Sequence, residues 1–149
     1  NDLQQLVLAE RFDGLAEMTL QLSGGQLLAA VAVSAGSAVS GSEKGVELEL
    51  EREESFATVS LNTADDAPDP GVVGIVLDSS RKGNIIFCYR GDSADGHEPP
   101  QCTGRKLDQG QNKLFFRVLK QFKNGTLEIR PALPGRYRLD SIAVRTETL

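Results

Sequence analysis

The sequence predicts an all-β fold, an antiparallel β-sandwich of the jelly-roll kind, preceded by a short N-terminal helix. Apolar and polar residues alternate along successive short segments, which is the pattern of strands with one face on a core and one in water. Turn-forming Gly, Pro, Asn and Asp residues recur between these segments, and neither a strand–helix alternation nor an internal repeat accompanies them. We expect about eight to ten strands, in a single β-sandwich domain over residues 1–149.

The first elements are predicted to be a helix and two strands. Residues 1–18 suit a helix because Leu3, Leu6 and Val7 share one face. From Met18 the pattern changes to alternation, which indicates a strand that ends at the Gly24-Gly25 pair. Small apolar residues at 29–33 predict another strand, and the Gly- and Ser-rich residues 35–45 predict a flexible connection.

The clearest strand is predicted over residues 46–51, where Val and Leu alternate with Glu. A second strand follows a short turn at Glu53-Glu54, with either Phe56, Thr58 and Ser60 or the alternate Ala57 and Val59 turned inward. After a Pro- and Asp-rich loop, the apolar run at residues 72–78 suits a strand covered on both faces. Residues 84–90 form the next apolar strand.

The last third predicts a hairpin and a closing strand. Residues 112–122 and 126–130 flank a turn containing Asn124-Gly125, a pair that tolerates the positive φ values of tight hairpin turns. Pro134-Gly135 predicts a further turn, and residues 137–145 alternate as the final strand.

Charge and composition exclude several classes of function. The net charge is −5, and no basic stripe is concentrated as a nucleic-acid partner would require. No apolar run is long enough to cross a bilayer, so we expect no membrane span. The chain begins at Asn1 rather than Met, which suggests a processed or excised segment of a larger polypeptide.

Cys88 and Cys102 are the only cysteines, and they stand at the two ends of a turn-rich segment. This arrangement favours a disulfide across a loop over a metal site, which would need further thiols. A disulfide would indicate a secreted, extracellular or periplasmic protein. Two unpaired buried thiols in a cytosolic protein are the alternative.

No catalytic pattern stands out. The sole histidine, His97, lies between Gly96 and Glu98 in a loop that does not hold it beside a nucleophile. No P-loop, Ser elbow or His-Glu-x-x-His helix occurs. We therefore expect that the chain is not an enzyme.

Acidic loops raise the question of calcium, which prefers carboxylate and carbonyl oxygens. Asp92, Asp95 and Glu98 in the cysteine loop are the predicted metal ligands, and calcium is the predicted cofactor. The spacing does not match an EF-hand, and ordinary solvated turns, in which Asp and Pro favour the bend, are the preferred interpretation of such loops.

The closing segment Gly-Arg-Tyr-Arg-Leu-Asp-Ser-Ile-Ala-Val-Arg, residues 135–145, resembles the final strand of carbohydrate-binding modules with a galactose-binding-like jelly roll. The resemblance implies a non-catalytic sugar-binding sandwich, usually secreted and often stabilised by calcium. It covers a structural strand, so it assigns no binding residue. The chain departs from that family in having no Trp on which a sugar ring could stack.

The sequence thus predicts a secreted module that binds a carbohydrate or another cell-surface ligand through its loops. Tyr89 is the candidate for stacking, with Arg90 and Asp92 placed to hydrogen-bond hydroxyl groups; a core role for Tyr89 remains open. The cationic residues gather in the second half, and an acidic polysaccharide would suit them if they share a face. The alternatives are a pilin-like structural, assembly or adhesion subunit and a small carboxylate-based hydrolase or lyase.

Overall fold

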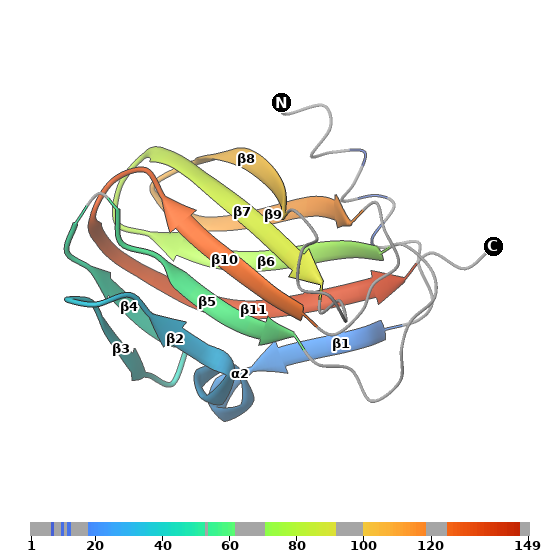
Figure 1. Ribbon diagram of the computed structural model, residues 1–149, viewed down its shortest axis with the longest axis horizontal. Coiled ribbons are helices and arrows are strands. Elements are labelled where there is room, and N and C mark those ends of the chain that lie inside the picture. Colours follow the sequence, from blue (N-terminus) through green and yellow to red (C-terminus); the bar gives the residue numbers. More distant parts are fainter. Residues whose placement is uncertain are drawn as a thin grey trace.

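The computed structural model describes residues 7, 10, 12, 18–52, 54–61, 71–91, 100–118 and 125–146. Two antiparallel sheets lie face to face and enclose the core between them (Figure 1). In sheet A, the strand order is β3 (Ala38–Gly41), β4 (Val46–Leu50), β11 (Gly135–Thr146), β6 (Gly71–Ser79) and β9 (Gly110–Val118), and β1 (Met18–Ser23) also pairs with β11. In sheet B, the order is β2 (Val31–Val33), β5 (Ala57–Leu61), β10 (Gly125–Pro131), β7 (Gly83–Gly91) and β8 (Gln101–Leu107). The predicted antiparallel sandwich is confirmed.

Alternation along the strands builds the core as the sequence predicts. In β4 every second residue is buried and the two glutamates between them face water. In β5 the inward set is Ala57, Val59 and Leu61, which settles the choice that the sequence left open. In β7, Ile85 and Phe87 are buried, whereas Ile86 between them points to solvent.

The strand β11 organises sheet A because it has neighbours along its whole length. Its first half pairs with β4 and its second half with β1, while β6 runs along its other side. The closing strand that the sequence predicts over residues 137–145 is therefore confirmed, and it lies in the interior of the sheet.

The predicted N-terminal helix falls mostly outside the described residues. Phe12 is described, and it is 9% exposed. Its ring lies 5.4 Å from the ring of Phe115 and under the guanidinium of Arg145, whose Nη1 donates a 2.9 Å hydrogen bond to the Phe12 carbonyl oxygen. Phe115 and Arg145 stand on β9 and β11, so Phe12 covers part of the outer side of sheet A. This cover explains why β6 is buried on both faces between Gly71 and Ile75.

The strand predicted over residues 29–33 is only partly correct. Residues up to Ala30 belong to helix α2 (Gly24–Ala30), and β2 begins at Val31. Gln, Leu and Ala are good helix formers, and Leu27 is fully buried by the helical conformation. The run of small apolar residues at 29–33 therefore contains the end of helix α2 and the start of strand β2.

The predicted hairpin between residues 112–122 and 126–130 is wrong. The strand β9 pairs with β6 in sheet A, whereas β10 pairs with β5 and β7 in sheet B. The chain also changes sheet between β4 and β5, and between β10 and β11. An Asn-Gly pair permits a tight turn, but the inward side chains fit either sheet, so strand patterns alone do not choose the neighbour.

The edges of the two sheets meet at β8 and β9. The Gln101 side chain donates a hydrogen bond of 2.5 Å to the carbonyl oxygen of Arg117, and Arg105 Nε donates one of 3.0 Å to that of Phe115. These bonds satisfy backbone groups of an edge strand and close this side of the sandwich. In the part of the chain that the structure describes, no helix is long and apolar enough to cross a membrane.

Candidate functional site

Two of the three residues predicted to bind a ligand, Tyr89 and Arg90, lie in the described part of the chain and point to opposite sides of sheet B. Arg90 is exposed near the end of β7. Tyr89, one residue earlier, points the opposite way into the core and is 5% exposed, which favours its core role over a stacking role. Asp92, and with it the proposed metal ligands Asp95 and Glu98, lies outside the described residues.

The disulfide predicted between Cys88 and Cys102 is present. These cysteines are directly opposite each other on β7 and β8. Neither cysteine side chain belongs to the buried core, and the pair lies on the solvent side of sheet B, beside Arg90 and Ile86. The bond ties together two strands of that side and spans the loop whose residues the sequence proposes as ligands.

The solvent side of sheet B, here called the sheet B face, is a grid of side chains from four neighbouring strands. It faces the viewer in Figure 1, where β5, β10 and β7 cross the front of the molecule. Register places Arg130 beside Ile86, and Ile86 beside Gly104. Arg130 also lies over the ring of Phe56, with 4.9 Å between its Cζ and the ring centroid. One row across the sheet therefore combines an aromatic ring, a guanidinium and an exposed aliphatic side chain.

The next row holds polar groups and the disulfide. Glu128 stands between Thr58 and Cys88. It accepts a 3.0 Å hydrogen bond from Arg130 Nη2. The third row has Arg90 beside Thr126, which stands opposite Ser60. Hydroxyl, carboxylate and guanidinium groups thus flank two apolar side chains on an open surface.

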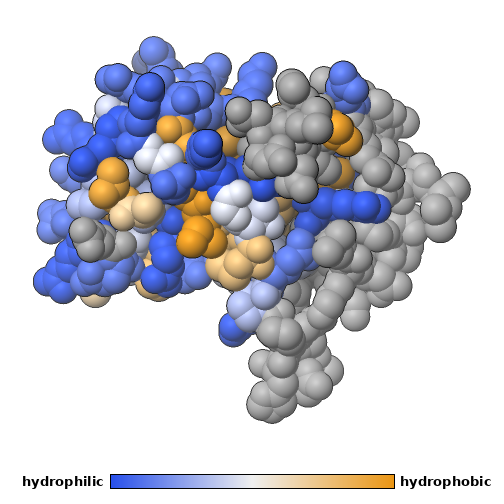
Figure 2. Space-filling model, turned by 90° about the horizontal axis from the view of Figure 1, so that it is seen from above, coloured by the Kyte–Doolittle hydropathy of each residue, from blue (hydrophilic) through white to orange (hydrophobic). Residues whose placement is uncertain are grey.

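Open space accompanies these groups. A Cβ atom added at Gly104 would meet no atom within 4 Å, so the space beside Ile86, which is 44% exposed, is open. Exposed hydrophobic groups lie among hydrophilic ones elsewhere as well, as Figure 2 shows for the molecule seen from above. This mixture suits a ligand with both polar and apolar groups better than a partner protein with a large hydrophobic surface.

The sheet B face is cationic although the chain as a whole is acidic. Arg90, Arg130 and Lys106 point outward from β7, β10 and β8, and Glu128 is the acidic residue among them. The formal charges of these four residues add up to +2, whereas the net charge of the whole chain is −5. Of the cationic residues that gather late in the sequence, Lys106 and Arg130 therefore share this face with Arg90. The others do not all lie there, since Arg136, Arg138 and Arg145 stand on β11 in sheet A.

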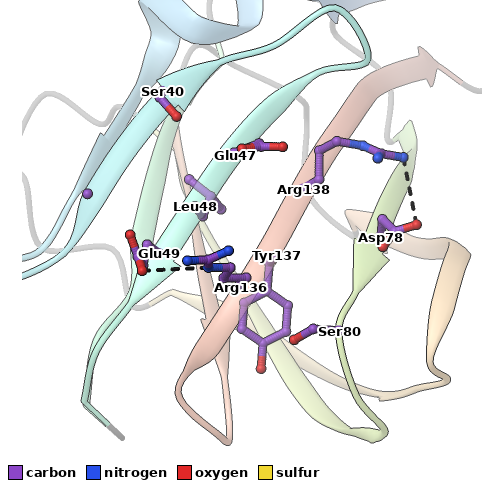
Figure 3. Close-up of a pocket in the computed structure, with 10 residues that line it drawn as sticks. Ser40, Glu47, Leu48, Glu49, Asp78, Ser80, Arg136, Tyr137 and Arg138 are labelled. Carbon is purple, nitrogen blue, oxygen red and sulfur yellow. Dashed lines mark ion pairs between the residues drawn. The ribbon is translucent and has the colours of Figure 1, made fainter.

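A second surface, here called the sheet A hollow, lies on the outer side of β3, β4, β11 and β6 (Figure 3). Its volume is about 380 Å³. Register alternates opposite charges across it: Arg136 stands opposite Glu49, and Arg138 stands between Glu47 and Asp78. Tyr137 contributes to its floor, but its ring belongs to the core.

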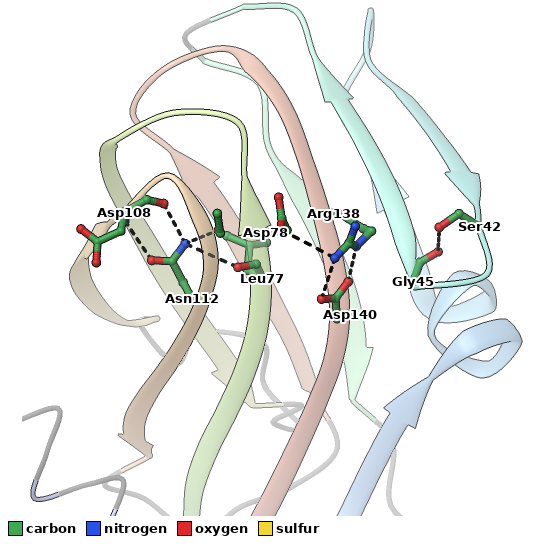
Figure 4. A network of polar contacts seen from close by, with 9 residues as sticks. Ser42, Gly45, Leu77, Asp78, Asp108, Asn112, Arg138 and Asp140 are labelled. Carbon is green, nitrogen blue, oxygen red and sulfur yellow. Dashed lines mark hydrogen bonds and ion pairs between the residues drawn. The ribbon is translucent and has the colours of Figure 1, made fainter.

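Both arginines of the sheet A hollow are paired with carboxylates. Arg138 Nε donates to Asp140 Oδ1 at 2.5 Å, and Arg138 Nη2 lies 3.7 Å from Asp78 Oδ2 (Figure 4). The hydrogen bond to Asp140 is the main reason that the pKa of Arg138 is raised above its ordinary value. Arg136 Nε lies 3.6 Å from Glu49 Oε1. With these donors already engaged, the hollow has less to offer a ligand than the sheet B face.

Figure 4 also shows how the neighbouring turn is held. The Asn112 side chain is buried and accepts a 2.8 Å hydrogen bond from the backbone N–H of Asp108. Its Nδ2 donates to the carbonyl oxygens of Asp108 and Gly110, at 2.9 and 3.0 Å. Asn112 therefore has a structural role in the β8–β9 turn.

Metal ligands are not grouped in the described part of the chain, where no cluster of three or more His, Cys, Asp or Glu side chains has a suitable arrangement. The calcium prediction concerns Asp92, Asp95 and Glu98, so it stays a prediction.

Sequence reasoning missed Phe56, Ile86, Glu128 and Arg130 as site residues. The available signal was alternation: on β7, Ile86 lies between two residues assigned to the core, which leaves it on the outer face. Deciding that Phe56, Arg130 and Ile86 share one row, with Glu128 in the next, requires the pairing of β5, β10 and β7, which the sequence does not contain.

No protein-family model matches the chain, and no curated protein matches it in sequence. Solved structures do match in fold. The CBM22-1 xylan-binding domain of Paenibacillus barcinonensis Xyn10C aligns with a TM-score of 0.66 and 13% identity, over 91% of this chain and 97% of that one. The CBM6cm-2 carbohydrate-binding module of Cellvibrio mixtus lichenase 5A, in complex with cellotriose, aligns at 0.55 and 9% over 89% and 100%.

A longer protein with a module of this kind also matches. The CBM22-1–GH10 segment of Clostridium thermocellum xylanase 10B aligns with a TM-score of 0.70 and 7% identity. The alignment covers 88% of this chain but only 28% of that two-module chain. Identities this low establish likeness of fold alone. The chain has the jelly-roll β-sandwich fold of carbohydrate-binding modules, as the resemblance of its closing strand implies.

Proposed function

We propose that the chain is a non-catalytic carbohydrate-binding module whose sheet B face contacts the glycan. The observation that carries the proposal is the grid of Phe56, Ile86, Arg90, Glu128 and Arg130 on a sandwich with the fold of such modules. Sugar rings present apolar C–H groups and hydroxyl groups together, and this surface offers a complement to both.

The apolar part of the proposed site lies in the row of Phe56 and Ile86. Arg130 is held between them by its contact with the Phe56 ring and its hydrogen bond to Glu128. A guanidinium fixed in this way loses little freedom when it donates to a ligand hydroxyl. The disulfide beside this row limits movement of β7 and β8, which further pre-organises the surface.

The sheet B face is preferred to the sheet A hollow on three grounds. The arginines of the hollow are already paired with carboxylates. Phe12 and Phe115 also cover the adjoining part of sheet A, which limits the length of polymer that this side can accept. The sheet B face also contains Arg90, which is the exposed one of the two predicted ligand residues in the described ranges.

Two further features belong to the same proposal. The disulfide supports a secreted or periplasmic location, where such bonds persist. Calcium bound by Asp92, Asp95 and Glu98 would stabilise the folded chain. A rise in melting temperature with added CaCl₂, lost in an Asp95→Asn variant, would support this proposal.

The test is binding to a panel of soluble glycans, measured by isothermal titration calorimetry. The panel contains neutral polysaccharides, including xylan and cello-oligosaccharides, and acidic polysaccharides. We expect at least one to bind, and an Ile86→Ala variant to bind it about tenfold more weakly, equivalent to about 1.4 kcal/mol. Leu133→Ala is the matched control, since Leu133 is similarly exposed, at 36%, but lies in the β10–β11 turn.

The same panel separates the two surfaces. Arg136→Ala removes a guanidinium of the sheet A hollow whose side chain is 83% exposed, so folding should be unaffected. If Arg136→Ala abolishes binding and Ile86→Ala does not, the sheet B face is not the site. If no glycan binds the parent chain, the proposed function is wrong.

A further inference from the structure

We infer that the glycan bound by the sheet B face carries carboxylate groups, as in a polymer containing uronic acids. This inference rests on the proposed function and adds the chemical class of the ligand. It comes from the charge of the face rather than from its shape.

The cations are spread along the face rather than gathered at one point. Lys106 stands opposite Asn84, Arg130 opposite Ile86, and Arg90 is further along β7. Asn84 and Arg90 are six positions apart on the strand, so the array extends roughly 20 Å at about 3.3 Å per residue. A row of this length suits a polymer with repeated charges better than a single small anion.

The cations are also available. Arg90 and Lys106 form no ion pair with any residue in the described ranges, and both side chains are exposed. Arg130 has one acidic neighbour, Glu128, which leaves other guanidinium N–H groups for a ligand. Arginine can bind a carboxylate through two parallel hydrogen bonds, so these side chains can recognise uronate groups and do more than attract them.

The sheet A hollow has the reverse balance. Arg136 and Arg138 meet more carboxylates there than they can neutralise, since Glu47, Glu49, Asp78 and Asp140 all lie beside them. An acidic polymer is therefore disfavoured at the hollow and attracted by the sheet B face. The cations Lys113, Arg117 and Arg145 of sheet A stand on β9 and β11 outside the hollow.

The experiment compares polymers that differ only in charge. One pair is polygalacturonate and the same polymer fully methyl-esterified; the other is glucuronoxylan before and after reduction of its carboxyl groups. We expect the acidic member of at least one pair to bind at least tenfold more tightly at low ionic strength. Raising NaCl from about 0.02 M to about 0.5 M should remove most of this preference, because the salt screens exposed charges.

Charge-reversal variants locate the effect. The double variant Arg90→Glu/Lys106→Glu should lose the preference for the acidic polymer. Arg136→Glu combined with Lys113→Glu changes the net charge equally but on sheet A, and it should keep the preference. If both double variants lose it equally, the attraction is a property of net charge and the assignment to the sheet B face is wrong.

The outcomes distinguish this inference from the proposed function. If neutral glycans bind through Ile86 and neither acidic polymer binds better than its neutral partner, the carboxylate inference is wrong and the proposed function stands. If neither charged nor neutral glycans bind, the proposed function fails and the inference fails with it.

Discussion

Tyr137 shows how a single side chain links the core to a turn. Its ring is buried between the sheets, and its hydroxyl donates a 2.6 Å hydrogen bond to the carbonyl oxygen of Leu133 in the β10–β11 turn. Burial raises the pKa of the phenol, and the nearby charge of Arg81 offsets part of the rise. The folded protein therefore holds this proton more tightly than the unfolded chain does.

The sign of the resulting pH dependence follows from linkage. The stability that Tyr137 contributes is fully present below the unfolded pKa, which is about 10, and is lost as pH rises through the higher folded pKa. We expect Tyr137→Phe to lower the free energy of unfolding by about 1 kcal/mol near pH 7. As the pH is raised from 7 into the alkaline range, the free energy of unfolding measured with urea should fall less for the variant than for the parent chain. An equally steep alkaline loss in both proteins would contradict this role.

Gly45 is a second residue whose importance is set by a close approach. A Cβ atom there would lie 2.5 Å from the carbonyl oxygen of Leu139 and 2.9 Å from Asp140 Cα. The Gly45 carbonyl oxygen accepts a 2.8 Å hydrogen bond from the backbone N–H of Ser42 and a 3.1 Å hydrogen bond from the Ser42 hydroxyl. These bonds close the β3–β4 turn, and Figure 4 shows the one from the hydroxyl. A position that the sequence places in a flexible connection is therefore tightly packed against β11.

At the scale of elements, the β7–β8 pair carries both the disulfide and part of the proposed site. Register places the two cysteines directly opposite each other, so the bond adds a covalent link to an existing strand pair. The link restricts the unfolded chain by closing a loop between residues 14 positions apart.

We expect the double variant Cys88→Ser/Cys102→Ser to lose about 3 kcal/mol of unfolding free energy, the loop-closure value for a loop of this size. The substitutions should add little further loss of stability from an internal cavity, because both cysteine side chains are at least partly exposed. Urea denaturation with and without a reductant measures the effect. The reductant should destabilise the parent chain and leave the double variant unchanged; a parent chain insensitive to reduction would show that the bond adds no stability.

At the scale of the whole molecule, the two outer sides of the sandwich differ in how far other side chains cover them. Sheet A is partly covered by Phe12, while the described residues of sheet B leave its face open between Phe56 and Gly104. The space at Gly74 is already limited by this cover, because a Cβ there would lie 3.1 Å from the Phe115 ring and 3.3 Å from that of Phe12. Phe12 thus packs on strands far away in the sequence.

We expect Phe12→Ala to lower the free energy of unfolding by about 3 kcal/mol, because it removes a buried ring together with its contacts to Phe115 and Arg145. Phe12→Leu keeps the apolar volume and should lose less than half as much. Urea denaturation measures both, and titration with the glycan should show unchanged affinity because the sheet B face lies on the other side. Equal stability of Phe12→Ala and the parent chain would show that this contact adds nothing.

Several elements could be predicted because their signal is local. Residues 46–51 and 137–145 alternate so regularly that their strands and inward residues follow from the sequence. The disulfide follows from having two cysteines at the ends of a turn-rich segment. The helix at Gly24–Ala30 was missed because small apolar residues satisfy both a short helix and a strand.

The sequence by itself determined the class of fold, the inward faces of the main strands and the pairing of the cysteines, because each depends on neighbours along the chain. Only the tertiary structure decided which strands are paired, and hence that β9 and β10 lie in different sheets and that Tyr89 turns inward while Arg90 turns outward beside Glu128 and Arg130. The physical reason is that strand pairing joins segments far apart in the chain, and alternation fixes only which residues share a side, not which strand lies next to them.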